Sequence, residues 1–166
     1  VIKVRLSNYA GQEVPMYWWS NIAVPETVDT RVIVPSTCAY TSNYSGSLCK
    51  VPVPYYDRKD LTYTTGELNS RDYFFRIPPE EPKFIATADK YGKGLLQQST
   101  KRLMSRKLFL WGMRRCYRNW QNLLSEICDP YIEIQAGLAQ TQMECIPMPK
   151  DAVWEWTEAY GPFRGD

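Results

Sequence analysis

Two polar side chains on one predicted strand carry the clearest chemistry in this sequence. In residues 131–135 (YIEIQ) polar and apolar side chains alternate, which is typical of a half-buried strand. Ile132 and Ile134 are then expected on one face, and Glu133 and Gln135 on the other. A carboxylate and a carboxamide two residues apart can hold two neighbouring hydroxyl groups of a ligand. The polar outer face of an ordinary hairpin shows the same alternation, so the pattern alone leaves both interpretations open.

More carboxylates follow toward the end of the chain, close to tryptophans. The set comprises Glu133, Glu144, Glu155 and Glu158, on predicted strands that also hold Trp154 and Trp156. Two carboxylates that face one cleft can act as acid and base at a glycosidic or anomeric centre. The separation of these glutamates in the sequence does not give their distance in space, so solvated carboxylates on a sheet face remain the alternative.

Aromatic side chains supply the second part of a candidate sugar site. The chain holds six Trp and twelve Tyr, which favours either a β-rich core or an aromatic-lined binding site. Trp18 and Trp19 are adjacent, so in a strand one of them must face away from the core. An exposed indole is a platform for the flat, CH-rich face of a sugar. Trp19 and Trp111 are our candidate platforms, and Glu155 is a candidate polar contact beside them.

Several catalytic and cofactor-binding classes are excluded by residue type. The sequence lacks a nucleophile elbow, a phosphate-binding loop and a dinucleotide-binding motif. It contains no histidine, which removes Ser-His and Cys-His catalysis. None of the five cysteines lies in a CxxC pair. We therefore expect no metal site and no cofactor.

A cluster of basic residues raises a different possibility. It comprises Lys101, Arg102, Arg106, Lys107, Arg114, Arg115 and Arg118, interleaved with Phe109, Trp111 and Tyr117. Such a patch can bind a phosphate-bearing polymer, or it can be a solvated edge strand and helix face. The formal net charge is only +2, which favours the solvated surface. We expect neither nucleic acid nor membrane as a partner.

The pattern of the whole chain predicts an all-β protein. Hydrophobic residues make up 44% and charged residues 23%, as in folded domains, and 166 residues suit a single domain. Apolar residues at helical spacing predict one short helix over residues 115–127, and residues 41–66 are expected to form long surface loops. The predicted strands are residues 2–6, 14–21, 31–34, 72–77, 84–88, 95–99, 107–111, 131–135, 141–146 and 153–160. We expect an antiparallel β-sandwich in which residues 131–146 form a hairpin.

The sequence also leads to expectations about the cellular location of the protein and about whether the chain is part of a larger one. The odd number of cysteines favours reduced thiols, and hence a cytoplasmic location. No apolar run reaches membrane-spanning length. The chain starts at Val1 and enters a predicted strand directly, so we expect it to be a piece of, or a partner to, something larger.

Six blocks of the sequence carry a family resemblance. They are VPMYWWSNIAVPE (14–26), TRVIVP (30–35), KLFLWG (107–112), NWQNLL (119–124), YIEIQAGLAQTQMECIPMP (131–149) and WEWTEAYGP (154–162). Together they resemble a family of bacterial domains of unknown function, which commonly lie N-terminal to tetratricopeptide repeats. That family is similar to the galactose-mutarotase-like superfamily, whose β-supersandwich serves sugar epimerases and glycosidases. The resemblance implies that residues 1–166 form the C-terminal portion of a larger supersandwich.

The resemblance also implies roles for particular residues. Epimerases of that superfamily carry a Leu-Glu-Thr-Gln strand whose glutamate takes the proton of the anomeric hydroxyl. The run from Ile132 to Gln135 is similar in form, which implies the base role for Glu133. The epimerases also have an Asn-His strand that supplies the acid. The comparable stretch here, residues 18–21, ends at Asn21 and has no histidine.

These observations lead to one expected function and two alternatives. We expect a domain that recognises carbohydrate through Glu133, Asn21, Gln135, Trp19 and Trp111. The first alternative is a sugar epimerase or glycoside hydrolase that uses Glu133 as its catalytic residue. The second is a scaffold whose aromatic surface packs on a partner domain. The expected partners are a carbohydrate and either the remaining N-terminal part of the supersandwich or the tetratricopeptide repeats.

Overall fold

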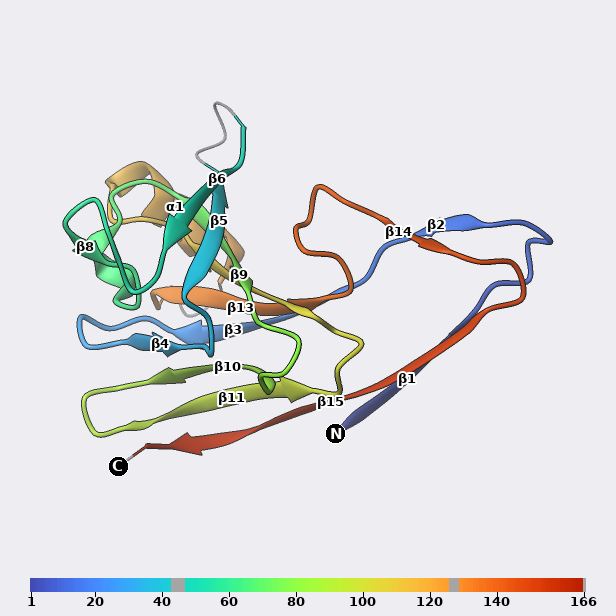
Figure 1. The fold of residues 1–166 in the computed structure, drawn as a ribbon. Coiled ribbons are helices and arrows are strands. Elements are labelled where there is room, and N and C mark those ends of the chain that lie inside the picture. The colour runs from blue at the N-terminus through green and yellow to red at the C-terminus, as the bar shows by residue number, and fades with distance from the viewer. Residues whose placement is uncertain (43–46, 126–128, 166) are drawn as a thin grey trace.

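Two antiparallel sheets packed face to face form the body of the molecule (Figure 1). The computed structural model describes residues 1–42, 47–125 and 129–165. The five-stranded sheet has the order β1 (Ile2–Ser7), β15 (Val153–Arg164), β11 (Lys93–Ser99), β10 (Lys83–Ala88) and β4 (Arg31–Ile33). The six-stranded sheet has the order β3 (Trp19–Pro25), β13 (Tyr131–Gly137), β12 (Ser105–Leu110), β9 (Arg71–Arg76), β5 (Cys38–Ser42) and β6 (Cys49–Pro52). The predicted all-β antiparallel sandwich is therefore confirmed.

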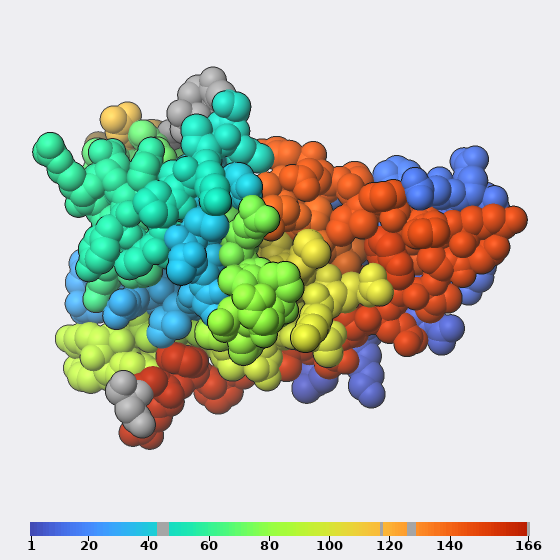
Figure 2. Space-filling model, viewed as in Figure 1, coloured from blue at the N-terminus to red at the C-terminus, as the bar shows by residue number. Residues whose placement is uncertain are grey.

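Smaller elements lie around these sheets. One pair is β2 (Val14–Met16) with β14 (Ile146–Met148), and another is β7 (Tyr55–Tyr56) with β8 (Lys59–Asp60). A 3-10 turn, η1, spans Thr64–Gly66, and the helix α1 spans Arg115–Leu124. The β2–β14 pair extends away from the body as an arm, seen at the right of Figure 1 and as blue and orange atoms at the right of Figure 2. No helix among the described residues is long and apolar enough to cross a membrane.

Alternating side chains of both sheets fill the space between them. Ile132 and Ile134 of β13, Leu108 of β12 and Ile85 of β10 are fully buried there. A second apolar cluster, around Leu103, Ala136, Leu138 and Trp156, continues the core toward the arm. The predicted alternation in β13 is therefore confirmed: its isoleucines face the core, and Glu133 and Gln135 face outward.

A buried carboxylate, Glu158 of β15, lies within the second cluster and is 1% exposed. Its Oε1 accepts hydrogen bonds from the indoles of Trp18 (3.3 Å) and Trp156 (3.0 Å). Its Oε2 accepts from Ser20 Oγ (2.5 Å), Gln97 Nε2 (3.3 Å) and the Tyr160 hydroxyl (3.3 Å). A buried carboxylate needs such donors to replace its lost water. Glu158 is therefore a structural centre that joins the two sheets.

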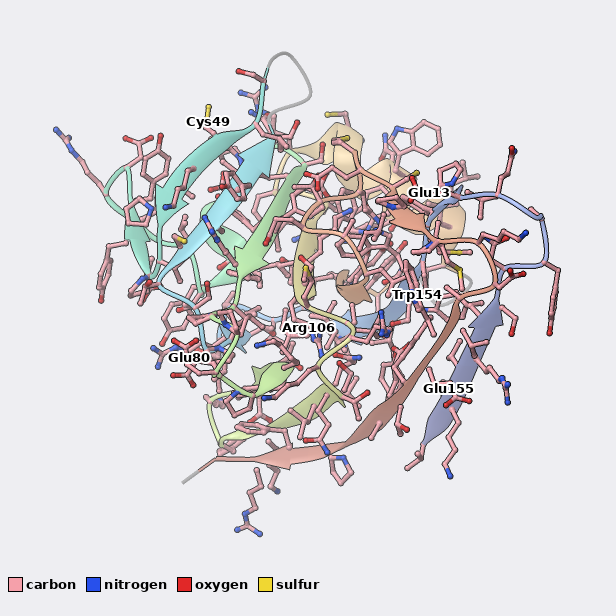
Figure 3. The ribbon with its side chains drawn as sticks, turned by 45° about the vertical axis from the view of Figure 1, so that its right-hand side comes forward. Glu13, Cys49, Glu80, Arg106, Trp154 and Glu155 are labelled. Carbon is pink, nitrogen blue, oxygen red and sulfur yellow. The ribbon has the colours of Figure 1, made fainter. Side chains whose placement is uncertain are left out.

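A buried cation, Arg106 of β12, lies in the same interior (Figure 3). Its guanidinium donates to the backbone oxygens of Leu103 (3.0 Å), Ser105 (2.9 Å) and Lys83 (2.6 Å), and to Ser99 Oγ (2.7 Å). Burial lowers the pKa of Arg106 to about 10, and the negative charge of Glu158 opposes that shift. The two buried charges therefore stabilise each other at neutral pH.

Three sequence predictions about local structure are wrong in part. The strand predicted over residues 14–21 is divided, because β2 ends at Met16 and β3 begins at Trp19 and continues to Pro25. The hairpin predicted over residues 131–146 does not form, because β13 pairs with β3 and β12 instead. The region predicted as loops, residues 41–66, contributes β6, β7, β8 and the end of β5.

The helix occurs where its period predicts it, but its apolar residues face outward. Trp120, Leu123 and Leu124 are 56%, 73% and 60% exposed. The buried residue is Gln121, whose Nε2 donates to the backbone oxygen of Tyr131 at 2.8 Å. The predicted end of the helix at Ile127 lies outside the described residues.

Candidate functional site

A polar row crosses the outer face of the six-stranded sheet. Gln135 of β13 is paired in register with Asn21 of β3 on one side and with Lys107 of β12 on the other. Lys107 is in turn paired with Phe74 of β9. These residues alternate along their strands with core residues, so they face away from the five-stranded sheet. Four strands that are distant in sequence therefore contribute to one surface.

Glu133 lies beside this row and is held by two carboxamides. Its Oε2 accepts hydrogen bonds from Asn21 Nδ2 at 2.7 Å and from Gln135 Nε2 at 3.1 Å. Its Oε1 has no hydrogen-bond partner among the described residues. The carboxylate is thus oriented by the protein, and one of its oxygens keeps its capacity to accept hydrogen bonds from a ligand.

The hydrogen bonds continue from Gln135 toward β9. Gln135 Oε1 accepts from Gln142 Nε2 at 2.8 Å, and Gln142 Oε1 accepts from Lys107 Nζ. Lys107 Nζ also pairs with Asp72 at 2.6 Å, and both side chains are about nineteen-twentieths buried. The ammonium lies 5.4 Å from the ring centroids of Phe74 and of Phe109. The charge of Lys107 is therefore balanced within the sheet, and Glu133 supplies the negative charge of the outer face.

A cavity of about 420 Å³ opens next to Glu133. Its wall includes Pro25 of β3, Leu124 at the end of α1, Asp129 and Tyr131. Burial raises the pKa of the Tyr131 hydroxyl, and the charge of Glu133 raises it further. The phenol therefore stays protonated at neutral pH and is available as a hydrogen-bond donor.

Two aromatic groups flank the polar residues. Near the cavity, the Trp111 ring packs edge-on against Tyr131 (5.8 Å between centroids) and Phe109 (5.0 Å). At the other end, Trp19 lies over Gly137 of the neighbouring strand and packs edge-on against Phe74. A Cβ at position 137 would lie 2.4 Å from the Trp19 ring, so only glycine leaves room for the indole there.

The structure brings together most, but not all, of the residues chosen from the sequence. Glu133, Asn21 and Gln135 are joined by hydrogen bonds. Trp111 and Trp19 both lie on the outer face of the same sheet. As expected for adjacent tryptophans, Trp18 faces the interior, where it packs on Trp156.

Glu155 lies apart from this group. It sits on β15 of the opposite sheet, exposed, with its carboxylate 3.6 Å from Arg5 Nε (Figure 3). Of the remaining carboxylates, Glu144 is exposed and accepts a hydrogen bond from Thr141, and Glu158 is buried between the sheets. None of these three residues lines the cavity beside Glu133. The possibility that a second of these four glutamates shares the cavity with Glu133 is therefore not realised, and the solvated alternative holds for Glu144 and Glu155.

Sequence reasoning missed Lys107, Asp72, Gln142, Tyr131 and Asp129 as members of this region. Lys107 was assigned to the basic cluster, which the fold disperses: Arg106 is buried, and Arg102 stacks on Trp154 with its guanidinium 5.0 Å from the ring. The available signal was the alternation in KLFLW (107–111), which puts Lys107, Phe109 and Trp111 on one face.

Comparison with known proteins gives a family and a fold. A family model described as "Domain of unknown function (DUF5107)" matches residues 3–153. No curated protein matches the chain. A solved TPR-domain-containing protein from Parabacteroides distasonis ATCC 8503 is 20% identical, with a TM-score of 0.77 over 97% of this chain. A candidate aldose 1-epimerase from Escherichia coli K12 is 8% identical, with a TM-score of 0.63 over 98% of this chain.

These similarities establish the architecture. The sandwich has the galactose-mutarotase-like fold that the sequence resemblance implied. The chain spans 27% of the Parabacteroides protein and 54% of the Escherichia coli protein. Since both identities are low, the likeness concerns the fold and leaves the chemistry of the site to be argued from its own residues.

Proposed function

We propose that this chain, which belongs to the DUF5107 family, recognises a carbohydrate at the outer face of its six-stranded sheet. One observation carries the proposal: the Glu133 carboxylate is oriented by Asn21 and Gln135 at the edge of a cavity of about 420 Å³. That volume lies within the usual range of small-molecule sites, about 300–1,000 Å³.

The chemistry of the surrounding groups suits a sugar. Sugar hydroxyls are both donors and acceptors, and the free Oε1 of Glu133 accepts while the Tyr131 hydroxyl donates. The Trp111 and Tyr131 rings, in contact with each other, supply apolar surface next to these polar groups. No Lys or Arg is among the described residues that line the cavity, and Lys107 of the polar row is paired with Asp72. A neutral polyhydroxylated ligand therefore fits better than an anionic one.

A binding experiment with a matched control tests this proposal. A panel of mono- and oligosaccharides is screened by thermal shift, since a ligand at one hundred times its Kd stabilises the fold by about 2.7 kcal/mol. We expect Glu133→Gln to weaken binding of any sugar found, because the amide donates where the carboxylate accepted. The control is Glu155→Gln, an exposed strand glutamate of the other sheet, which should leave affinity unchanged. Equal losses in both variants would contradict the assignment of the site.

Catalysis by the same carboxylate is the second candidate. Tyr131, whose hydroxyl pKa is raised by burial, lines the same cavity as Glu133, so a proton donor is available near the proposed base although the chain has no histidine. If Glu133 is a general base for an epimerase or glycoside hydrolase reaction, Glu133→Gln should lower turnover by about 10²–10⁴ with little change in sugar affinity. If the site only binds, affinity falls and the wild-type protein has no turnover toward the bound sugar.

A further inference from the structure

A second cavity, of about 610 Å³, lies at the end of the sandwich where β9 ends and β12 begins. Its lining comes from several separate parts of the chain: residues 37–38, 50, 76–79, 83, 101, 104 and 140. In Figure 2 these segments meet on the facing side of the molecule, where blue, light green, yellow and orange atoms adjoin. None of the residues assigned to the sugar site lines this cavity.

Cations gather around this cavity without acidic partners in its wall. Lys50, Arg76 and Lys101 line it, are exposed, and form no ion pair with any described residue. Lys83 lines it too, but its ammonium is buried and donates to the backbone oxygens of residues 78, 79 and 81. No aspartate or glutamate is among the lining residues. Three cationic side chains are therefore available to a ligand.

The lowered pKa of Lys83 indicates that the electrostatic potential around this cavity is positive. Burial lowers the pKa of its ammonium, and the positive charges of Lys101 and Arg106 lower it further. Glu80 and Glu81, in the turn before Lys83, oppose this shift but are exposed and do not line the cavity. Four lining cations and the buried Arg106 behind them thus outnumber these two carboxylates.

Part of the lining of the cavity is apolar. Ile77, Pro78, Pro79 and Met104 contribute to it, and Met104 is 47% exposed. Apolar surface beside exposed cations is complementary to a ligand that has an apolar body and one anionic group. We propose that this cavity binds a small organic anion, with its carboxylate or phosphate held by Arg76 and Lys101 and its apolar body on Pro78, Pro79 and Met104.

Calorimetric titration with four probes tests the proposal at one fixed ionic strength. The probes are phenyl phosphate, benzoate, inorganic phosphate and benzyl alcohol. We expect phenyl phosphate or benzoate to bind more tightly than inorganic phosphate, because only they have an apolar ring to contact Pro78, Pro79 and Met104. Benzyl alcohol, which lacks the charge, should not bind. The comparison of phenyl phosphate with benzoate identifies the preferred anion.

Charge-removing variants then locate the site. Arg76→Gln and Lys101→Gln should each weaken binding about tenfold, as expected for a lost charge-assisted hydrogen bond. Lys3→Gln, which removes an exposed lysine of β1 outside this cavity, should leave affinity unchanged. Both cavity residues are exposed, so the variants should fold normally, which circular dichroism verifies. Absence of binding by all anionic probes, equal binding of benzyl alcohol, or equal losses in all three variants would overturn the proposal.

Discussion

Replacing Glu158 by glutamine should destabilise the protein strongly, although it changes only one atom of the side chain. The two carboxylate oxygens accept five side-chain hydrogen bonds between the sheets. Two of the donors, the indoles of Trp18 and Trp156, cannot act as acceptors. The new amide nitrogen must therefore face Ser20 and Tyr160, whose hydroxyls can reverse their hydrogen bonds.

The magnitude follows from the charge that is lost. Hydrogen bonds to a charged group contribute about 1.5–3 kcal/mol, against about 0.5–1.5 kcal/mol between neutral groups. In addition, the fully buried Arg106 loses the negative charge that stabilises it. Removing one member of a buried charge pair costs about 3–5 kcal/mol, and these two groups are not in direct contact. We therefore expect Glu158→Gln to lower the free energy of unfolding by about 3 kcal/mol.

Urea denaturation followed by tryptophan fluorescence measures this difference, with Glu155→Gln as the control. The two glutamates lie three residues apart on β15, but Glu155 is exposed and its contact with Arg5 is between side chains 64% and 67% exposed. Its substitution should change stability by no more than about 0.5 kcal/mol. A Glu158→Gln protein as stable as the Glu155→Gln protein would refute the view that Glu158 joins the sheets through its charge.

Three further outcomes follow from individual contacts. Gly137→Ala should lower stability by about 1–3 kcal/mol, because its methyl group would collide with Trp19, while Gly161→Ala meets no atom within 4 Å and should be neutral in the same denaturation experiment. Lys107→Met should cost about 3–5 kcal/mol at pH 7, since it removes the ammonium that lies 2.6 Å from the buried Asp72 carboxylate; a loss below 1 kcal/mol would argue against the pair. Burial raises the pKa of Glu26, so its folded form holds the proton more tightly and stability falls as pH rises from about 4.5. Unfolding at pH 4 and pH 7 should show a smaller decrease for Glu26→Gln than for the wild type.

Local alternation was enough to predict the outward position of Glu133 and Gln135. In β13 the side-chain period of two is a property of the strand itself, so the faces follow from the sequence once the strand exists. The partners of that strand do not follow in the same way. β13 pairs with β3 and β12, and the segment after it carries Gln142 to the polar row instead of forming a hairpin. Pairing between distant strands depends on packing of the whole sandwich, which a local pattern does not record.

The same limit explains which site residues were missed. Asp72, Lys107 and Gln142 belong to separate segments, and their contact with one another exists only after β9, β12 and β13 have paired. The helix illustrates a related point. Its apolar spacing predicted a helix correctly, yet the buried residue is Gln121, because that side chain satisfies a backbone oxygen of the neighbouring segment. Periodicity thus identifies the element but does not decide which face is covered.

The alternation of side chains in residues 153–160 is sufficient to predict that Glu158 is buried. In VWEWTEAY, Trp154, Trp156 and Glu158 have the same parity, whereas Glu155 has the opposite one. A glutamate two residues from a core tryptophan on the same strand faces the same side and therefore enters the interior. There it needs hydrogen-bond donors that compensate for its lost water. The neighbouring indoles are such donors, and Trp156 does bind Glu158. Parity within one strand therefore separates the two glutamates into a buried residue that joins the sheets and an exposed one, before any partner strand is known.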